Sequence, residues 1–244
     1  MIKFKSMTTV LGLLVSSYAA AHSLYPDLVT TRSELSNRSI DTTTMPGKVL
    51  LRFSNGVANI GQGRLEIRGG NVVNGQREVF QRIFTTHSTY VSRFAGYMIY
   101  HPTHSHVHFK DFASYKIRRI VGATGVGEIV ASSQKVSFCL EDSAVYNSSL
   151  ANFRWFRRYS TCGSTVQGIS VGWKDVYHKS LPDQWVDVSN LSSGRYWLES
   201  SVDPTGLITE SNETNNTTRV QFDLVMPVSD RMEEGGEEVD LVVD

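Results

Sequence analysis

Short apolar runs separated by turn-forming residues recur along most of the chain. Residues 49–53, 186–188 and 196–202 are rich in Val, Leu, Phe, Tyr and Trp, and clusters of Gly, Asn and Ser lie between such runs. Residues 203–206 (Asp-Pro-Thr-Gly) form a turn signal, because Pro fixes φ and Gly accepts a positive φ. No long run shows a convincing helical period, although 145–160 could hold a short helix. The pattern predicts an all-β fold: one β-sandwich-like domain with long loops and at most short helices.

The two ends of the chain differ in composition from its middle. Residues 1–21 hold a basic start, a short apolar run and three consecutive alanines, which is the order typical of a secretory signal peptide. Residues 229–244 hold seven acidic residues and one arginine, which is typical of a solvated, disordered tail. We therefore expect residues 22–228 to form the folded domain and the mature protein to be secreted, outside the cell or into a periplasm.

Composition excludes several classes of protein. Apolar residues make up 40% and charged residues 20%, which excludes a disordered chain or a coiled coil. The 24 Lys and Arg residues balance 24 Asp and Glu residues, so bulk charge does not favour a nucleic-acid partner. The longest apolar stretch is too short to predict a transmembrane segment. The two cysteines, Cys139 and Cys162, are too few for a disulfide scaffold, but they can pair in an oxidising compartment or remain as buried thiols.

Four of the seven histidines fall within residues 101–108. On a strand, alternate side chains share a face, so His104, His106 and His108 would point in the same direction. They can bind one ion only if the segment bends, because the outer two would lie about 13 Å apart on a straight strand. Imidazoles favour Cu(II) or Zn(II) over Ca²⁺ or Mg²⁺. His101 breaks the alternation, and we expect it to orient the ligands rather than to bind the metal.

Several further blocks resemble the copper-dependent lysyl oxidase family. The histidine run is followed by Lys135-Val136-Ser137-Phe138-Cys139-Leu140-Glu141-Asp142. Other similar blocks follow in the family's order: 167–170, 175–177, 184–187 and 210–216. Segments 25–29 and 50–54 are also similar, so the resemblance spans about 25–220. Each piece alone is weak, but the ordered set is specific.

The resemblance implies an amine oxidase that uses molecular oxygen. It implies three copper ligands, at His104, His106 and His108. It also implies that Lys135 and Tyr177 cross-link to form a lysine tyrosylquinone cofactor. Such a cofactor condenses with peptidyl lysine or another primary amine, and an aldehyde, ammonia and hydrogen peroxide are released. We take Asp175, two residues before the tyrosine, as the candidate base that removes the proton from the carbon beside the nitrogen.

The resemblance implies two structural features as well. One is a disulfide between Cys139 and Cys162. The other is a calcium site with ligands at Asp27, the Leu28 carbonyl, Glu210, Asn212, Asn215 and Asn216. Carboxylate and amide oxygens suit this hard cation. The chain departs from animal members of the family at Thr103, where they have cysteine, and at Tyr100, where they have tryptophan. Collagen or elastin as the substrate therefore does not follow.

Two other functions remain open from the sequence. A three-histidine zinc hydrolase would keep water at an open metal position, but it would leave Lys135 and Tyr177 without a role. A non-catalytic metal-binding or adhesion sandwich would keep the fold without turnover. Zinc in a colourless protein would favour the hydrolase, and a lack of peroxide release with a primary amine would favour the non-catalytic protein.

Overall fold

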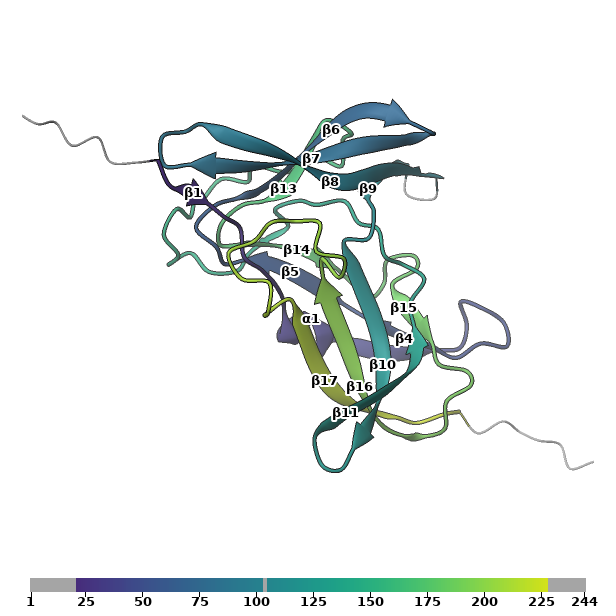
Figure 1. The fold of residues 1–244 in the computed structure, drawn as a ribbon. Coiled ribbons are helices and arrows are strands. Elements are labelled where there is room, and N and C mark those ends of the chain that lie inside the picture. The colour runs from purple at the N-terminus through teal and green to yellow at the C-terminus, as the bar shows by residue number, and fades with distance from the viewer. Residues whose placement is uncertain (1–20, 103–104, 228–244) are drawn as a thin grey trace, which may run out of the picture.

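A computed structural model describes residues 21–102 and 105–227 (Figure 1). The predicted signal peptide up to residue 20, the predicted ligand His104 and the acidic tail lie outside the described residues. Within them, strands predominate and the one helix is the single turn α1 (Arg32–Leu35). The all-β prediction is therefore confirmed. No helix in the described ranges is long and apolar enough to cross a membrane.

The described strands form four sheets, and all their pairings are antiparallel. The largest sheet has the order β13 (Val166–Ile169), β6 (Leu65–Val73), β7 (Gln76–Thr85), β8 (Tyr90–His101), β9 (His106–Phe109), with β1 (Ser23–Leu24) also paired to β7. The second has the order β11 (Gly125–Ser132), β10 (Ala113–Val121), β16 (Gly194–Val202), β17 (Thr217–Leu224). The third has the order β12 (Ala144–Val145), β14 (Trp173–Tyr177), β5 (Asn55–Asn59), β2 (Leu28–Thr30). The fourth has the order β15 (Trp185–Asp187), β4 (Leu50–Phe53), β3 (Arg38–Asp41).

Figure 1 shows the largest sheet at one end of the molecule and the sheet with β10, β16 and β17 toward the other, with β5 and β14 between them. A row of aromatic contacts connects β4, β10 and β14. Phe53 meets Tyr115 at 4.7 Å between ring centroids, Tyr115 meets Phe138 at 6.0 Å, and Phe138 meets Tyr177 at 4.7 Å. All three contacts are edge-to-face, and each contributes about 0.5–1.5 kcal/mol beyond the burial of apolar area. The core therefore extends to Tyr177, and the ring is held in a fixed orientation.

The apolar runs identified in the sequence are strands. Residues 49–53 contain β4, residues 186–188 overlap β15, and residues 196–202 lie within β16. The turn at 203–206 places Asp203 at φ 41° and Gly206 at φ 66°, in the left-handed region that glycine adopts without steric cost. Apolar runs between turn-forming residues therefore predicted these three strands.

Segment 145–160 does not form the short helix that its apolar spacing allowed. After β12 it continues as turns and irregular backbone. Its polar groups bind partners outside the segment: the Arg154 carbonyl accepts from Trp173 Nε1 at 2.9 Å, and the Arg158 N–H donates to Asp142 at 2.9 Å. These contacts replace the local hydrogen bonds that a helix would make, because tertiary partners outweigh a weak helical preference.

Candidate active site

The histidine run forms a hairpin rather than one strand. His101 is the last residue of β8 and His106 the first of β9, and the register pairs them directly. Residues directly opposite each other in antiparallel strands face the same side of the sheet. The rings of His101 and His108 lie 4.8 Å apart between centroids, as do those of His106 and His108. The turn therefore brings His101 onto the face of the other two imidazoles, which the alternation within the sequence did not reveal.

The geometry of the imidazoles fits a shared metal ion. The Nε2 atoms of His106 and His108 lie 2.9 Å apart, and His108 is buried. One ion at about 2.0–2.1 Å from each nitrogen could accept both. Two imidazoles, with a third ring beside them, are a donor set for copper or zinc and not for a hard cation.

Phe138 explains why Lys135 and Tyr177 lie near this hairpin. Its backbone N–H and carbonyl pair with those of Phe109 at 3.0 Å and 2.7 Å, so the segment that follows Lys135 runs beside β9. Lys135 Nζ lies 5.3 Å from the centroid of the Tyr177 ring and donates to the Pro182 carbonyl at 3.1 Å. Two side chains separated by 42 positions in the sequence are thus neighbours in the fold.

Burial shifts the pKa of both side chains. Burial lowers the pKa of Lys135 to about 8, although Asp183 opposes the shift. A substantial fraction of its amine is therefore neutral near physiological pH, and a neutral amine is a nucleophile. Burial also raises the pKa of Tyr177 well above its usual range, and the carboxyl of Asp175 adds to this shift. The Tyr177 hydroxyl donates to the Cys139 carbonyl and accepts from the Cys139 N–H, both at 2.8 Å.

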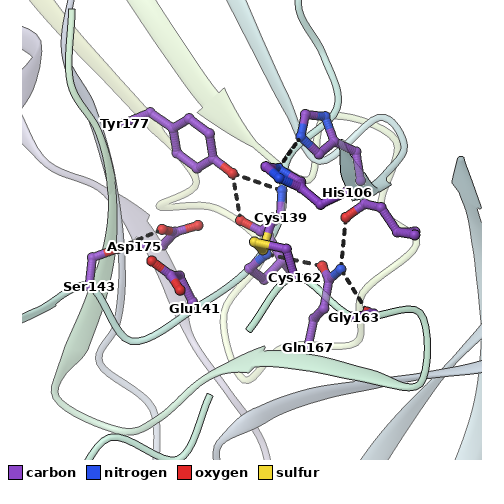
Figure 2. Close-up of a disulfide and its surroundings, with 12 residues drawn as sticks. His106, Cys139, Glu141, Ser143, Cys162, Gly163, Gln167, Asp175 and Tyr177 are labelled. Carbon is purple, nitrogen blue, oxygen red and sulfur yellow. Dashed lines mark hydrogen bonds between the residues drawn. A yellow bond between two sulfur atoms is a disulfide. The ribbon is translucent and has the colours of Figure 1, made fainter. Parts of the chain in front are cut away.

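A cavity of about 290 Å³ opens beside Tyr177 and is also lined by His106, Glu141 and Asp175 (Figure 2). Asp175 and Tyr177 stand two positions apart on β14 and share a face. Asp175 is buried and accepts from Ser143 Oγ at 2.9 Å. Burial raises the pKa of Asp175 well above its usual range, and the nearby Glu141 carboxyl acts in the same direction. Asp175 therefore places a buried carboxyl at the wall of the same cavity as Tyr177, where it can exchange a proton with a bound group.

Comparison with known proteins agrees with this arrangement. The sequence profile of the lysyl oxidase family matches residues 25–227. The chain belongs to the lysyl oxidase family. It is 37% identical over 121 residues to lysyl oxidase homolog 1 of Homo sapiens, and this alignment covers 49% of the chain and 19% of the relative. It is 32% identical over 124 residues to protein-lysine 6-oxidase of Sus scrofa, covering 50% and 45%, and 30% identical over 171 residues to lysyl oxidase homolog 3A of Danio rerio, covering 70% and 18%. The matches thus span less than half the length of these relatives.

This lysyl oxidase domain also gathers oxygen atoms where the calcium site was predicted. Asn215 Nδ2 donates to Asp27 at 2.8 Å, and Asn216 Nδ2 donates to Glu210 at 2.8 Å. The Leu28 N–H also donates to Glu210. Five of the six predicted residues therefore lie together, and they join β2 to the segment before β17. Leu28 meets Glu210 through its N–H, whereas its carbonyl oxygen was the predicted ligand. The side-chain oxygen of the sixth, Asn212, instead accepts hydrogen bonds from the N–H and the hydroxyl of Thr214.

Two residues of this oxygen cluster were missed by sequence reasoning. Carboxylate oxygens of Asp203, Glu210 and Glu213 lie within 4.8 Å of one another. The buried side-chain oxygens of Asn215 and Asn216 accept no hydrogen bond among the described residues. Glu213 follows Asn212 directly in the sequence, so it was an available candidate ligand in place of Asn212. Asp203 was interpreted only as a turn residue. Glu141 in the cavity was missed as well, although it lies in the block that carried the family resemblance.

The disulfide predicted from the resemblance is present in the lysyl oxidase domain. Cys139 and Cys162 are bonded and are 23 positions apart. Closing such a loop stabilises a fold by about 3 kcal/mol in the chain-entropy model. The backbone of Cys139 also holds the Tyr177 hydroxyl, and Cys162 lines the cavity. The bond therefore fixes one wall of the site.

Replacing both cysteines by serine is expected to lower the free energy of unfolding by about 3 kcal/mol. Chemical denaturation of the variant and of the oxidised wild type measures the difference. Treating the wild type with a thiol reductant should give the same loss. Equal stability of the two proteins would contradict a structural role for the bond.

A Lys135 side chain that is not linked to Tyr177 is expected to lower the free energy of unfolding, because its amine is buried. Because folding lowers its pKa from 10.5 to about 8, the folded state disfavours the charged amine, and stability rises with pH between these two values. In a Tyr177→Phe background, Lys135→Met is expected to raise the free energy of unfolding by about 2 kcal/mol at pH 7. The gain should shrink as the pH rises from about 8 to about 10.5. Urea unfolding of both proteins across this range tests it, and a gain that does not change with pH would contradict the assignment.

Proposed function

We propose that the protein is a secreted amine oxidase that depends on copper and on a lysine tyrosylquinone made from its own Lys135 and Tyr177. It converts peptidyl lysine or another primary amine to an aldehyde, and consumes oxygen and releases ammonia and hydrogen peroxide. The observation that carries the proposal is the position of Lys135 Nζ, 5.3 Å from the centre of the Tyr177 ring. Membership of the lysyl oxidase family supports the same reaction class.

In this proposal His106 and His108, with His104 as the third ligand, hold the copper. With oxygen, the ion would supply the oxidation of the Tyr177 phenol. Lys135 acts as the nucleophile, because burial leaves part of its amine neutral and the Pro182 carbonyl fixes Nζ near the ring. The hydrogen bonds to Cys139 and the edge-to-face contact with Phe138 hold the ring still during the reaction.

During turnover Asp175 takes the proton from the carbon next to the substrate nitrogen. Its position suits this role, because Asp175 lines the cavity together with Tyr177 and lies two positions before it on the same strand. Ser143 holds one carboxyl oxygen of Asp175 and leaves the carboxyl at the cavity wall. Burial raises the pKa of Asp175, and like-charge repulsion from Glu141 adds to the shift.

Peptide mapping of mature protein grown with copper tests the proposal. The expected product is one branched peptide that contains both Lys135 and Tyr177, together with peroxide release when a primary amine is added. Two separate linear peptides, with zinc in a colourless protein, would contradict it. The same mass measurement reports the N-terminus, which should be His22 if residues 1–21 are removed on secretion.

We also propose that the oxygen cluster around Asp27, Glu210 and Asn216 binds calcium. Support comes from oxygen ligands that converge from β2 and from the segment before β17. They include the amide oxygens of Asn215 and Asn216, which accept no hydrogen bond from the residues that the structure describes. A bound cation would balance the carboxylates and tie the first part of the domain to the last.

Calcium is expected to raise the melting temperature of the protein, by an amount equivalent to about 2.7 kcal/mol at a concentration one hundred times the dissociation constant. Glu210→Gln should remove this response. The substitution is expected to cost the calcium-free protein about 1–3 kcal/mol, because both carboxyl oxygens of Glu210 accept hydrogen bonds and a glutamine amide offers only one oxygen. The response to calcium is therefore measured for each protein against its own calcium-free state. Glu128→Gln, on the exposed strand β11, is the matched control and should keep the response. A wild-type melting temperature that does not change when calcium is added would contradict the proposed calcium site.

A further inference from the structure

Segment 153–158 presents aromatic and basic side chains to solvent. Five consecutive side chains are exposed: Arg154, Trp155, Phe156, Arg157 and Arg158. The tryptophan is 76% exposed and the phenylalanine 57%. Large aromatic residues left in water next to arginines are the composition of interface hot spots, where Trp and Arg are enriched.

This segment is held in place at both ends. The Phe153 ring stacks on Trp173 at 6.3 Å between centroids, and Trp173 Nε1 donates to the Arg154 carbonyl. The Arg158 N–H donates to the buried carboxylate of Asp142 at 2.9 Å. The exposed rings and guanidinium groups are therefore preorganised, which reduces the entropy lost when a partner binds.

A second group of arginines surrounds one carboxylate on β6. Buried Glu66 lies 3.3 Å from Arg64, 2.9 Å from Arg68 and 3.7 Å from Arg82. Three guanidinium groups around one carboxylate leave an excess of positive charge. Tyr159, directly after the exposed segment, donates its hydroxyl to the same Glu66 at 2.8 Å. This hydrogen bond joins the two groups of arginines.

A hollow of about 290 Å³ lies where the two groups meet. Its walls include Arg64, Phe84, Arg154, Phe156 and Arg158. None of the described side chains that line it is acidic. The Arg64 guanidinium lies 3.3 Å from the centroid of the Phe84 ring, which fixes its orientation. We name Arg64, Phe84, Arg154, Phe156 and Arg158 the arginine surface.

The arginine surface is connected to the proposed active site. Arg157, between Phe156 and Arg158, forms an ion pair with Glu141 at 3.4 Å. Glu141 lines the cavity that also holds Asp175 and Tyr177 (Figure 2). Cys162, four positions after Arg158, lines the same cavity. The segment that carries the arginine surface is therefore tied to the wall of the cavity through Arg157 and Cys162.

We propose that the arginine surface binds acidic residues of a polypeptide substrate whose lysine enters the cavity beside Tyr177. The inference rests on the proposed amine oxidase function and narrows its substrate to lysines that are followed or preceded by Asp or Glu. Guanidinium groups bind carboxylates through two parallel hydrogen bonds, and Trp155 and Phe156 offer apolar contact to the side chains between them. A small free amine would reach neither feature.

Two peptides of equal length test the proposal. Each carries one lysine, and they differ only in flanking Glu residues that are replaced by Gln in the second. With copper-loaded wild type, the Glu peptide is expected to have a kcat/KM about tenfold higher, as measured by peroxide release, and a Kd about tenfold lower by fluorescence anisotropy. The preference should fall when NaCl is raised from about 50 mM to about 500 mM, because salt screens exposed charges.

The double variant Arg154→Gln/Arg158→Gln is expected to lower the ratio of the two kcat/KM values to about one to two. Arg119→Gln/Arg195→Gln is the matched control, since both arginines are exposed and lie on the sheet of β10 and β16. The control should keep the full preference. Loss of the preference in the control, or its survival in the double variant, would overturn the assignment.

The failures of the two proposals are distinguishable. Equal turnover and equal binding of the two peptides by wild type would overturn the arginine surface and leave the amine oxidase intact. Selective binding of the Glu peptide without oxidation of any amine would contradict the amine oxidase but not the surface. Tight binding of phosphatidylserine vesicles or of a sulfated polysaccharide, with no preference between the peptides, would also overturn a polypeptide partner.

Discussion

Tyr177→Phe is expected to reduce amine oxidation by at least about three orders of magnitude, because it removes the hydroxyl whose oxidation would create the cofactor. Reaction with phenylhydrazine, a reagent for quinone carbonyls, should disappear with it. The ring keeps its edge-to-face contact with Phe138 and loses two hydrogen bonds to Cys139, so the variant should still fold, with a loss of about 1–3 kcal/mol in the free energy of unfolding.

Tyr196→Phe is the matched control for this experiment. Tyr196 is buried on β16, and its hydroxyl donates one hydrogen bond to the Ser192 carbonyl at 3.0 Å. It should lose stability and keep both the phenylhydrazine adduct and peroxide release. If the Tyr177→Phe protein retained an adduct, the tyrosine would not be the source of the cofactor and the proposed function would be wrong in its central step.

Substituting Gln for His106 or for His108 should abolish copper retention. Each substitution removes one of two converging nitrogens, and we expect copper affinity to fall by more than about 100-fold. Without copper the cross-link between Lys135 and Tyr177 should not form. Elemental analysis after dialysis, combined with peptide mapping of the same sample, measures both effects.

His87→Gln controls for the general effect of removing a histidine. His87 is exposed in the turn between β7 and β8 and lies outside the histidine hairpin. This protein should bind one equivalent of copper, as the wild type should, and should carry the cross-link. Full copper occupancy in both the His106→Gln and the His108→Gln proteins would show that the ion binds elsewhere.

The parts of the fold that follow from local pattern were predictable from the sequence. The strands β4, β15 and β16 are short apolar runs ended by turn residues, and a period of two is a strong local signal. The proximity of Lys135 to Tyr177 was anticipated only through the resemblance to a family. The disulfide was implied by the same resemblance, and pairing was already one of two possibilities for two cysteines in a secreted chain. Nothing in a lone lysine or a lone tyrosine indicates that the two side chains will meet.

The missed features depend on long-range register. His101 joins the imidazole face because the hairpin pairs it with His106, and no count along the sequence shows where a chain reverses. Asp203 and Glu213 join the oxygen cluster from opposite ends of a loop. Segment 145–160 forms hydrogen bonds with Trp173 and Asp142 and not those of a helix, and these two residues come close to it only in the folded chain. In each case a contact between distant segments decided the outcome, and single-sequence patterns are least informative about such contacts.

The two hydrogen bonds between the Tyr177 hydroxyl and Cys139 have a consequence for how the protein is made. A phenol that both donates and accepts, in a buried setting that raises its pKa, keeps its proton at physiological pH. Phenolates give up electrons far more readily than phenols do, so the protonated ring of Tyr177 resists oxidation. If the proposed cofactor forms, its maturation would need an agent that withdraws that proton, and the unprocessed precursor could be stored in a dormant state.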